Sequence, residues 1–169
     1  MLIETILRRP IRMGLILYVI LAFVCCKGGA VKQEVSYASL EKKGDLFYLK
    51  GNSKPFSGAA IEYHPDGKTK ATEFHYQNGK LHGPAYLYYE DGTLAGEFAH
   101  RNGVGQGTMR EFYKNGQKKL EVEVVNGQKE GIERQWYWDG KKKSEITYKQ
   151  GKLSGRYMTW DINGNIVQN

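Results

Sequence analysis

The stretch GTMREFYKNGQKKLEVEVVNGQKEG, residues 107–131, spans one full period of a repeat that organises most of the chain. It begins and ends on glycines 24 residues apart, and it contains two further glycines, Gly116 and Gly127. Each of these two follows an asparagine. An Asn-Gly pair between strand-like runs is a strong local signal for a tight turn. The stretch therefore predicts two strands joined by one turn, with a second turn leading into the next period.

The same three glycine positions recur along the chain from residue 58 onward. Spacings in the first series are 25, 24, 24 and 24 residues, and registered recurrence of this kind indicates a repeat architecture. The glycines expected at structural turns fall into three series: Gly58, Gly83, Gly107, Gly131 and Gly155; Gly67, Gly92, Gly116, Gly140 and Gly164; Gly79, Gly103, Gly127 and Gly151. Five repeats follow from this pattern, over residues 58–82, 83–106, 107–130, 131–154 and a truncated 155–169.

The second glycine series predicts the turn within each hairpin. In the first repeat, Pro65 suits the first central position of a type I turn, and Gly67 suits the left-handed residue of a bulge that follows. Turns of this type are expected at residues 65–67, 90–92, 114–116, 138–140 and 162–164. The first repeat has one residue more than the others, and we expect the extra residue on its second strand or in the loop after it.

The second strand of each repeat alternates between apolar and polar residues. One side carries Phe74, Phe98, Val122 and Ile146, and the other carries Glu73, Glu97, Glu121 and Glu145. A period of two with one apolar side is typical of a half-buried antiparallel strand. The glutamates are expected to pair across strands with basic neighbours such as Arg110 and Arg134.

An aromatic residue always stands five positions after the first glycine of a repeat. The members are Tyr63, Tyr88, Phe112, Trp136 and Trp160. We expect them to stack into a row along the sheet, with about 0.5–1.5 kcal/mol per aromatic pair beyond area burial. One repeat cannot bury its apolar side alone, so stacking on its neighbours is what stabilises it. The predicted fold is all-β: an antiparallel meander of stacked β-hairpins.

These residues resemble a known family of repeats. The segment GEFAHRNGVGQGTMREFYKNG, residues 96–116, resembles the MORN repeat, and the copies at 73–92, 121–140 and 145–164 look most like its bacterial variant. The resemblance covers about residues 44–169, and it implies an elongated, single-layer antiparallel sheet of stacked β-hairpins. Only Gly96 keeps the glycine before glutamate, where the other copies have Thr72, Leu120 and Ser144.

The resemblance implies a function in interaction or assembly. Members of the family are mostly described as interaction modules, and some eukaryotic members are proposed to contact phospholipids. Many bacterial variants are named as antitoxins of toxin–antitoxin pairs. None of these implied roles involves catalysis.

The N-terminus has the layout of a secretory signal. Three arginines precede an uninterrupted apolar run at residues 14–24, and Cys25 and Cys26 follow directly. A cysteine at this place resembles the acceptor of a bacterial lipoprotein, so both are candidate lipidation sites. Two alternatives stay open: ordinary cleavage after the small residues Gly28 and Ala30, or an uncleaved membrane anchor. We expect a signal or anchor at 1–26, a flexible tether at 27–43 and N-terminal capping strands at 44–57.

Other classes of site find little support in the sequence. The net charge of +7 and the pI of about 9.3 fit an acidic partner or an anionic membrane surface, without being specific for either. The glycines of residues 101–110 recur in copies without a Gly-x-Gly pattern, and no helix follows them, which argues against a nucleotide loop. The four histidines show no metal-ligand spacing. We therefore expect no enzyme activity, no cofactor, no metal and no nucleic-acid binding.

The combined expectation is a membrane-anchored protein-binding scaffold in the bacterial cell envelope, with its repeats outside the cytoplasm. The aromatic row and an open C-terminal edge near Trp160 are the expected contact surface for a protein partner. One alternative is an antitoxin or immunity protein that neutralises a toxin by direct binding. A second alternative is a module that binds anionic lipid headgroups.

Overall fold

The computed structural model describes residues 33–168. Cys25 and Cys26, the signal or anchor expected at 1–26 and the first part of the expected tether lie outside these residues. Within the described part of the chain, no helix has the length and apolar character needed to cross a membrane.

Five β-hairpins follow one another from residue 58 to residue 168. Their strands are β4 (Gly58–Tyr63) and β5 (Lys70–Gln77), β6 (Lys80–Tyr88) and β7 (Leu94–Arg101), β9 (Gly107–Phe112) and β10 (Lys118–Val125), β11 (Gln128–Trp136) and β12 (Lys142–Lys149), and β13 (Lys152–Trp160) and β14 (Ile166–Gln168). A two-residue strand, β8 (Val104–Gly105), precedes β9 and pairs with β7. The alternating second strands are β5, β7, β10 and β12, as their period of two requires.

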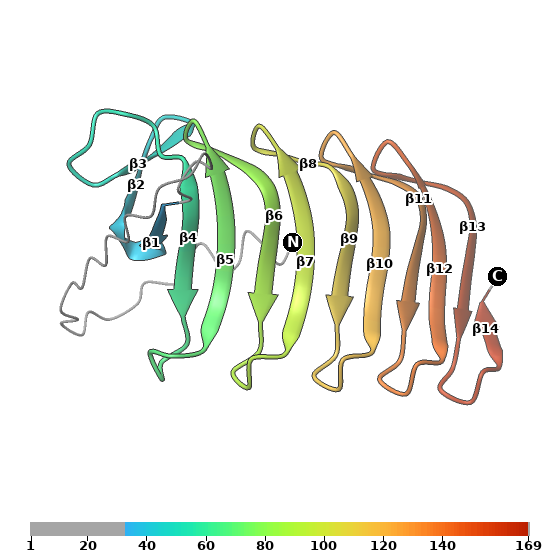
Figure 1. Cartoon of the computed structure of the whole chain (residues 1–169). Coiled ribbons are helices and arrows are strands. Elements are labelled where there is room, and N and C mark those ends of the chain that lie inside the picture. The colour runs from blue at the N-terminus through green and yellow to red at the C-terminus, as the bar shows by residue number, and fades with distance from the viewer. Residues whose placement is uncertain (1–32, 169) are drawn as a thin grey trace, which may run out of the picture. The chain divides into compact units, whose positions relative to one another are not determined.

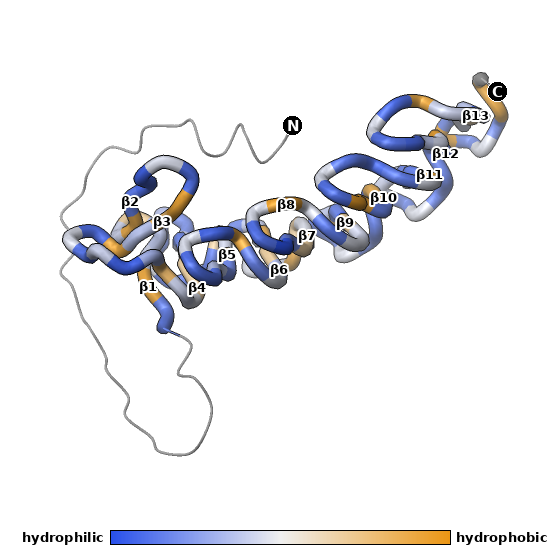
Figure 2. Tube along the Cα trace, turned by 90° about the horizontal axis from the view of Figure 1, so that it is seen from above, coloured by the Kyte–Doolittle hydropathy of each residue, from blue (hydrophilic) through white to orange (hydrophobic). Residues whose placement is uncertain are grey.

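The hairpin strands lie in one sheet in the order in which they occur in the chain. Each strand from β4 to β14 pairs antiparallel with the next, apart from the short side pairing of β8. Figure 1 shows the strands side by side from β4 to β14, and Figure 2 shows the same hairpins from above as a single row. The predicted all-β meander of hairpins is confirmed. One strand departs from it, because β1 (Glu34–Ser36) joins the sheet parallel to β4.

Two kinds of turn alternate along the array. In the turns inside the hairpins the left-handed glycine donates its N–H three residues back, as Gly92 does to the Tyr89 carbonyl at 2.9 Å. In the turns between hairpins two consecutive residues have positive φ, such as Asn102 at 53° and Gly103 at 86°. Two successive positive φ values define a type I′ turn, whose twist matches that of the flanking strands. Every connection between neighbouring strands is therefore short, which produces a meander.

The extra residue of the first repeat lies in the hairpin turn, so the expectation of a place on the second strand or after it is wrong. Tyr63 pairs with Lys70, whereas the equivalent Tyr88 pairs with Leu94 one residue sooner. The Asp66 carboxylate stabilises the longer turn by accepting from the N–H groups of Lys68 and Thr69, both at 2.9 Å. Side-chain acceptors of this kind replace the strand pairing that the inserted residue interrupts.

The segment before residue 58 forms a cap on the first hairpin. A 3₁₀ turn, η1 (Tyr37–Ser39), follows β1, and β2 (Leu40–Lys43) pairs with β3 (Leu46–Leu49) in a separate two-stranded sheet. Leu40 and Phe56 are buried against Ala60 and Tyr76 of the first hairpin. Residues 34–43 therefore belong to the cap, and their assignment to a flexible tether is wrong. Burial of Leu40 in this cluster gives the segment an apolar contact that a tether lacks.

Most of the buried apolar residues of the sheet lie on the side that carries the apolar residues of the second strands, here called the apolar face. It holds Ala60, Phe74, Ala85, Phe98, Met109 and Val122, one on each of the strands β4, β5, β6, β7, β9 and β10. Ala60 is fully buried under the cap, and Val122 is only 1% exposed. No apolar residue after Val122 in the described chain is buried to this degree. The core is thus confined to the N-terminal three hairpins.

Candidate protein-interaction surface

The opposite side of the sheet, here called the ladder face, carries the glutamates of the second strands. Arg110 lies between two of them and donates to Glu97 at 2.7 Å and to Glu121 at 2.8 Å. In the fourth hairpin, Arg134 of β11 donates to Glu145 of β12 at 3.3 Å. The expected cross-strand pairing of the glutamates with Arg110 and Arg134 is present in the structure. These carboxylates therefore form ion pairs that hold neighbouring strands together.

The ion pairs shift the titration of the ladder groups. The hydrogen bond from Arg110 is the main cause that lowers the pKa of Glu121, and the hydrogen bond from Lys142 has that role for the pKa of Glu145. Because folding lowers these pKa values, the pairs stabilise the fold above the ordinary carboxyl pKa. That contribution is lost as the pH falls through the lowered values.

The aromatic row lies on the ladder face, and its members do not stack on one another as expected. Tyr88, Phe112 and Trp136 stand two strands apart, because the second strand of each hairpin lies between them. Lys118 pairs with Phe112 across the hairpin, and its ammonium lies 5.1 Å from the ring centre of Trp136. Lys142 lies 5.5 Å from the ring centre of Trp160 in the same way. The C-terminal part of the row is thus an alternation of rings and lysines, held by cation–π contacts.

A second set of tyrosines links consecutive hairpins near their turns. The hydroxyl of Tyr89 donates to the Phe112 carbonyl at 2.7 Å, and Tyr113 and Tyr137 repeat this contact at 2.8 Å to the carbonyls 23 residues later. His64 occupies the equivalent place in the first hairpin, with Nε2 3.0 Å from the Tyr88 carbonyl. Sequence reasoning missed this role, although the tyrosine that directly follows three of the five aromatic row positions marks it.

Glu133 interrupts the apolar face of the fourth hairpin. It is 2% exposed and lies where the other first strands carry an alanine, a methionine or a tyrosine. The ammonium of Lys129 pairs with its carboxylate, and the amide of Gln135 donates to it at 2.8 Å. A buried carboxylate is stable only with such partners. The core therefore ends at a polar cluster, and the C-terminal hairpins lie beyond it.

Exposed apolar side chains gather in these last hairpins. Ten large hydrophobic residues of the described chain are well exposed, and seven of them follow residue 130. These seven are Ile132, Trp138, Leu153, Tyr157, Ile162, Ile166 and Val167. Trp138 is 65% exposed in a turn position where the first three repeats have Pro65, Glu90 and Lys114. Comparison of the turn positions among the repeats would have singled out this tryptophan, whereas the alternation of residues along the strands does not.

The C-terminal edge differs from the expectation of an open strand near Trp160. There β14 covers the edge, because Ile166 pairs with Trp160 and Gln168 with Thr159. The uncovered part of β13 in the described chain lies farther along, from Gly155 to Met158. Of the expected row, Trp160 and Trp136 are half-buried, and only Tyr63 is well exposed, at 47%.

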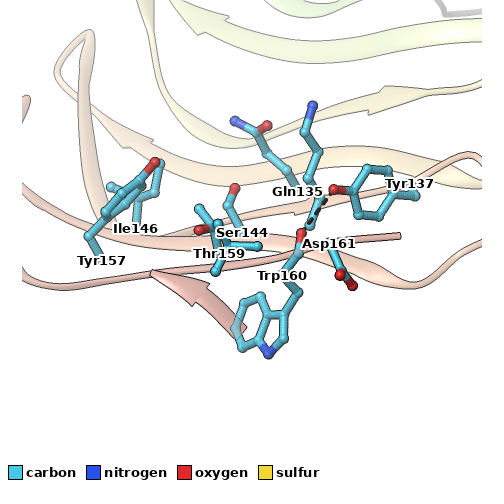
Figure 3. A pocket seen from close by; sticks show the side chains of 10 residues that line it. Gln135, Tyr137, Ser144, Ile146, Tyr157, Thr159, Trp160 and Asp161 are labelled. Carbon is cyan, nitrogen blue, oxygen red and sulfur yellow. Dashed lines mark hydrogen bonds between the residues drawn. The ribbon is translucent and has the colours of Figure 1, made fainter. Parts of the chain in front are cut away.

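A shallow hollow of about 390 Å³ lies at the same end of the sheet. Figure 3 shows Tyr157 and Ile146 at one end and Tyr137 at the other, with Ser144 and Thr159 between them. The hydroxyl of Ser144 is buried and has no hydrogen-bond partner among the described residues. The hollow adds a concave region to the exposed apolar surface, and both belong to the last two hairpins.

The histidines act separately rather than as a site. His75 bonds the Pro84 carbonyl through Nδ1 at 2.8 Å, and His82 lies 3.3 Å from the Asn102 side-chain oxygen. His100 is half-buried, and this burial lowers its pKa. Across residues 33–168, no three His, Cys, Asp or Glu side chains gather as metal ligands would.

Comparison with known families matches the central hairpins. The MORN repeat variant model matches residues 81–102, 106–126 and 129–150, and each match covers one hairpin from its first strand into its second. No curated protein matches the chain significantly. The matched hairpins carry the ladder pairs of Arg110 and Arg134 and three of the five aromatic row positions. The three β-hairpins between residues 81 and 150 are therefore similar in sequence to the MORN repeat variant.

Proposed function

We propose that the chain is a non-enzymatic scaffold that binds a protein partner through its last two hairpins. The observation that carries the proposal is the concentration of exposed apolar side chains after residue 130. Exposed apolar groups that gather at one place on a soluble surface are a feature of interaction sites. MORN repeats are generally associated with protein and membrane-lipid binding, which agrees with a binding role.

The composition of this surface favours a protein partner. Trp138, Tyr157 and Leu153 are exposed aromatic and aliphatic side chains of the last two hairpins, and Trp and Tyr are over-represented among the residues that dominate interface energetics. The exposed Lys149 and Lys152 pair with each other across β12 and β13, beside Leu153. An apolar centre with a polar rim is the usual anatomy of a protein–protein interface.

The lipid alternative has weaker support on the ladder face. Lys70, Lys118 and Lys142 are the regular basic positions of that face, and each pairs with a glutamate of its own strand. Anionic headgroups would have to compete with these carboxylates for the same ammonium groups. The antitoxin or immunity role is one case of the proposed protein binding, in which the partner is a toxin.

Binding through the last hairpins predicts site-specific crosslinks. A photoreactive amino acid placed at Tyr157 should capture a discrete partner in cells, whereas the same group placed at the exposed Val104 should not. With the captured protein purified, Trp138→Ser should weaken its affinity about tenfold, because a truncated anchor loses contact area at the interface. Val104→Ser is the matched control and should leave the affinity unchanged. Equal crosslinking at both sites, or equal affinities of both variants, would contradict the proposal.

The membrane anchor of the proposed scaffold has a separate test. If Cys25 or Cys26 is a lipid acceptor, labelled palmitate should be incorporated into the chain, and the protein should fractionate with membranes. Changing both cysteines to serine should abolish the label. An unlabelled chain that still fractionates with membranes would favour the uncleaved anchor, and a soluble, shortened chain would favour ordinary cleavage.

A further inference from the structure

A strip of the ladder face in the second, third and fourth hairpins carries aromatic side chains at a regular interval. Tyr88 of β6, Phe112 of β9 and Trp136 of β11 occupy it, and one second strand, β7 or β10, lies between consecutive members (Figure 1). Neighbouring strands lie about 4.7–4.9 Å apart, so equivalent positions two strands apart recur about every 9.4–9.8 Å along the array. Each of the three residues is half-buried and keeps surface open to solvent.

This interval fits the repeat of an extended sugar polymer. In a β-1,4-linked glycan each pyranose is turned over relative to the one before it, and the same face returns after one disaccharide, over a length close to this interval. The C–H face of a pyranose packs on an aromatic side chain, because the contact removes apolar surface of both from water. The three aromatic side chains would therefore contact the same face of every second sugar. An α-1,4-linked glycan coils and does not present its sugars in this way.

Polar side chains on the same face are placed to bond the hydroxyl groups of such a ligand. Arg110 precedes Phe112 by two residues on β9, so the two side chains share the ladder face. The side chain of Arg110 is 38% exposed although it pairs with Glu97 and Glu121. Hydroxyl groups both donate and accept hydrogen bonds, so they can bond to a cation and a carboxylate without separating the two.

The charges of the strip favour a neutral ligand. Lys118, whose ammonium lies 5.1 Å from the ring centre of Trp136, pairs with Glu121, and Lys142 pairs with Glu145. An anionic polymer gains much of its affinity by neutralising cations of the protein with its own charges. Here glutamates of the same face already neutralise these cations. A neutral glycan does not have to displace them.

We propose that the strip formed by Tyr88, Phe112 and Trp136 binds an extended, neutral β-1,4-linked glycan that runs along the array, across the strands. The aromatic side chains contact the faces of alternate sugars. Arg110 and Lys118 donate to the hydroxyl groups beside them, and the glutamates paired with these cations accept from the same hydroxyl groups.

This site goes beyond the proposed protein-binding function. It uses none of the exposed side chains assigned to the protein partner, which are Trp138, Leu153 and Tyr157. A scaffold with both sites joins a polysaccharide to a protein partner.

Cellohexaose and maltohexaose are matched probes of the strip, because they contain the same sugar in the same number and differ in the linkage. Isothermal titration of the full chain should show that cellohexaose binds at least about tenfold more tightly than maltohexaose and than cellobiose, since only the longer, extended chain reaches several aromatic side chains together. Added salt should leave the affinity unchanged, because no net charge is neutralised. Chitohexaose separates the two sources of such glycans, since tighter binding than cellohexaose would assign acetamido sugars to the strip.

Substitutions in the strip test the placement of the ligand. Phe112→Ala should weaken cellohexaose binding about tenfold, whereas Phe112→Tyr should retain it. Circular dichroism shows whether each variant is folded, and Trp136→Ala should give the same loss if Phe112→Ala does not fold. Trp138→Ser is the matched control, because it removes an exposed ring that lies outside the strip, and it should leave the glycan affinity unchanged.

Several outcomes would overturn this inference. They are equal binding of cellohexaose and maltohexaose, no gain in affinity with chain length, unchanged affinity in the folded alanine variants, or no binding of cellohexaose and chitohexaose at millimolar concentration. Preferred binding of an anionic polymer that is lost at high salt would also overturn it. The crosslinks at Tyr157 test the protein partner separately, so their failure leaves the glycan site standing, and failure of the titrations leaves the proposed function standing.

Discussion

Gly79→Ala is expected to destabilise the fold by about 3 kcal/mol, because the alanine would be strained both in its backbone conformation and in its packing. Gly79 has a φ of +77°, which costs an alanine about 1–2 kcal/mol. The added methyl would also lie 2.9 Å from the Leu46 Cβ and 3.0 Å from the Phe47 carbonyl oxygen. Gly79 accepts a backbone hydrogen bond from the Phe47 N–H and donates one to the Phe56 carbonyl. The cap therefore cannot move away from the added methyl without losing these two hydrogen bonds.

The matched control for this substitution is Gly116→Ala. Gly116 has nearly the same φ, +80°, but a methyl added there meets no atom within 4 Å. It should cost only the conformational part, about 1–2 kcal/mol. Urea denaturation of both variants measures the difference, and hydrogen exchange of β2 and β3 shows whether the cap opens first. Equal destabilisation by the two substitutions would mean that the contact between cap and first hairpin contributes little.

Lys129→Ala is expected to destabilise the fold by about 3 kcal/mol, whereas adding Glu133→Met to it should recover most of the loss. Removal of the lysine leaves a nearly fully buried carboxylate with Gln135 as its remaining partner. An uncompensated buried charge is costly, while replacement of the whole pair by an apolar side chain is often neutral. Methionine is the natural choice, because Met109 occupies the same position in the preceding hairpin.

Thermal or urea unfolding of the single and double variants measures this asymmetry. A control is Lys149→Ala, which removes an exposed lysine that pairs with no carboxylate in residues 33–168 and should change stability by less than about 0.5 kcal/mol. If the double variant were as unstable as Lys129→Ala alone, the ion pair would stabilise the fourth hairpin by more than the compensation of the buried Glu133 charge.

Local features of the sequence were sufficient to predict the hairpins. The spacing of the glycines and the residues before them determine where the chain reverses, because turn geometry depends on only a few consecutive residues. The alternation in β5, β7, β10 and β12 likewise determines which side chains share a face. The pairing of Arg110 with Glu97 and Glu121 was also accessible, since opposite charges recur at matching places in the repeat.

Features that depend on contacts between distant segments were not predictable in this way. The fold of residues 34–43 depends on Leu40 reaching Ala60 and Tyr76, and nothing local to that polar segment indicates it. The burial of Glu133 is likewise decided by Lys129 and Gln135 folding over it. The pairing of Trp160 also became visible only with the register of β14.

The aromatic row illustrates the division between the two kinds of information. By itself the sequence determined that Tyr63, Tyr88, Phe112, Trp136 and Trp160 recur at one place in each repeat. Only the tertiary structure decided what lies between them, because each hairpin inserts its second strand between consecutive members of the row. A lysine therefore contacts Trp136 where an aromatic ring was expected. A period along the chain determines equivalence between residues, whereas adjacency in space is determined by the pairing of strands.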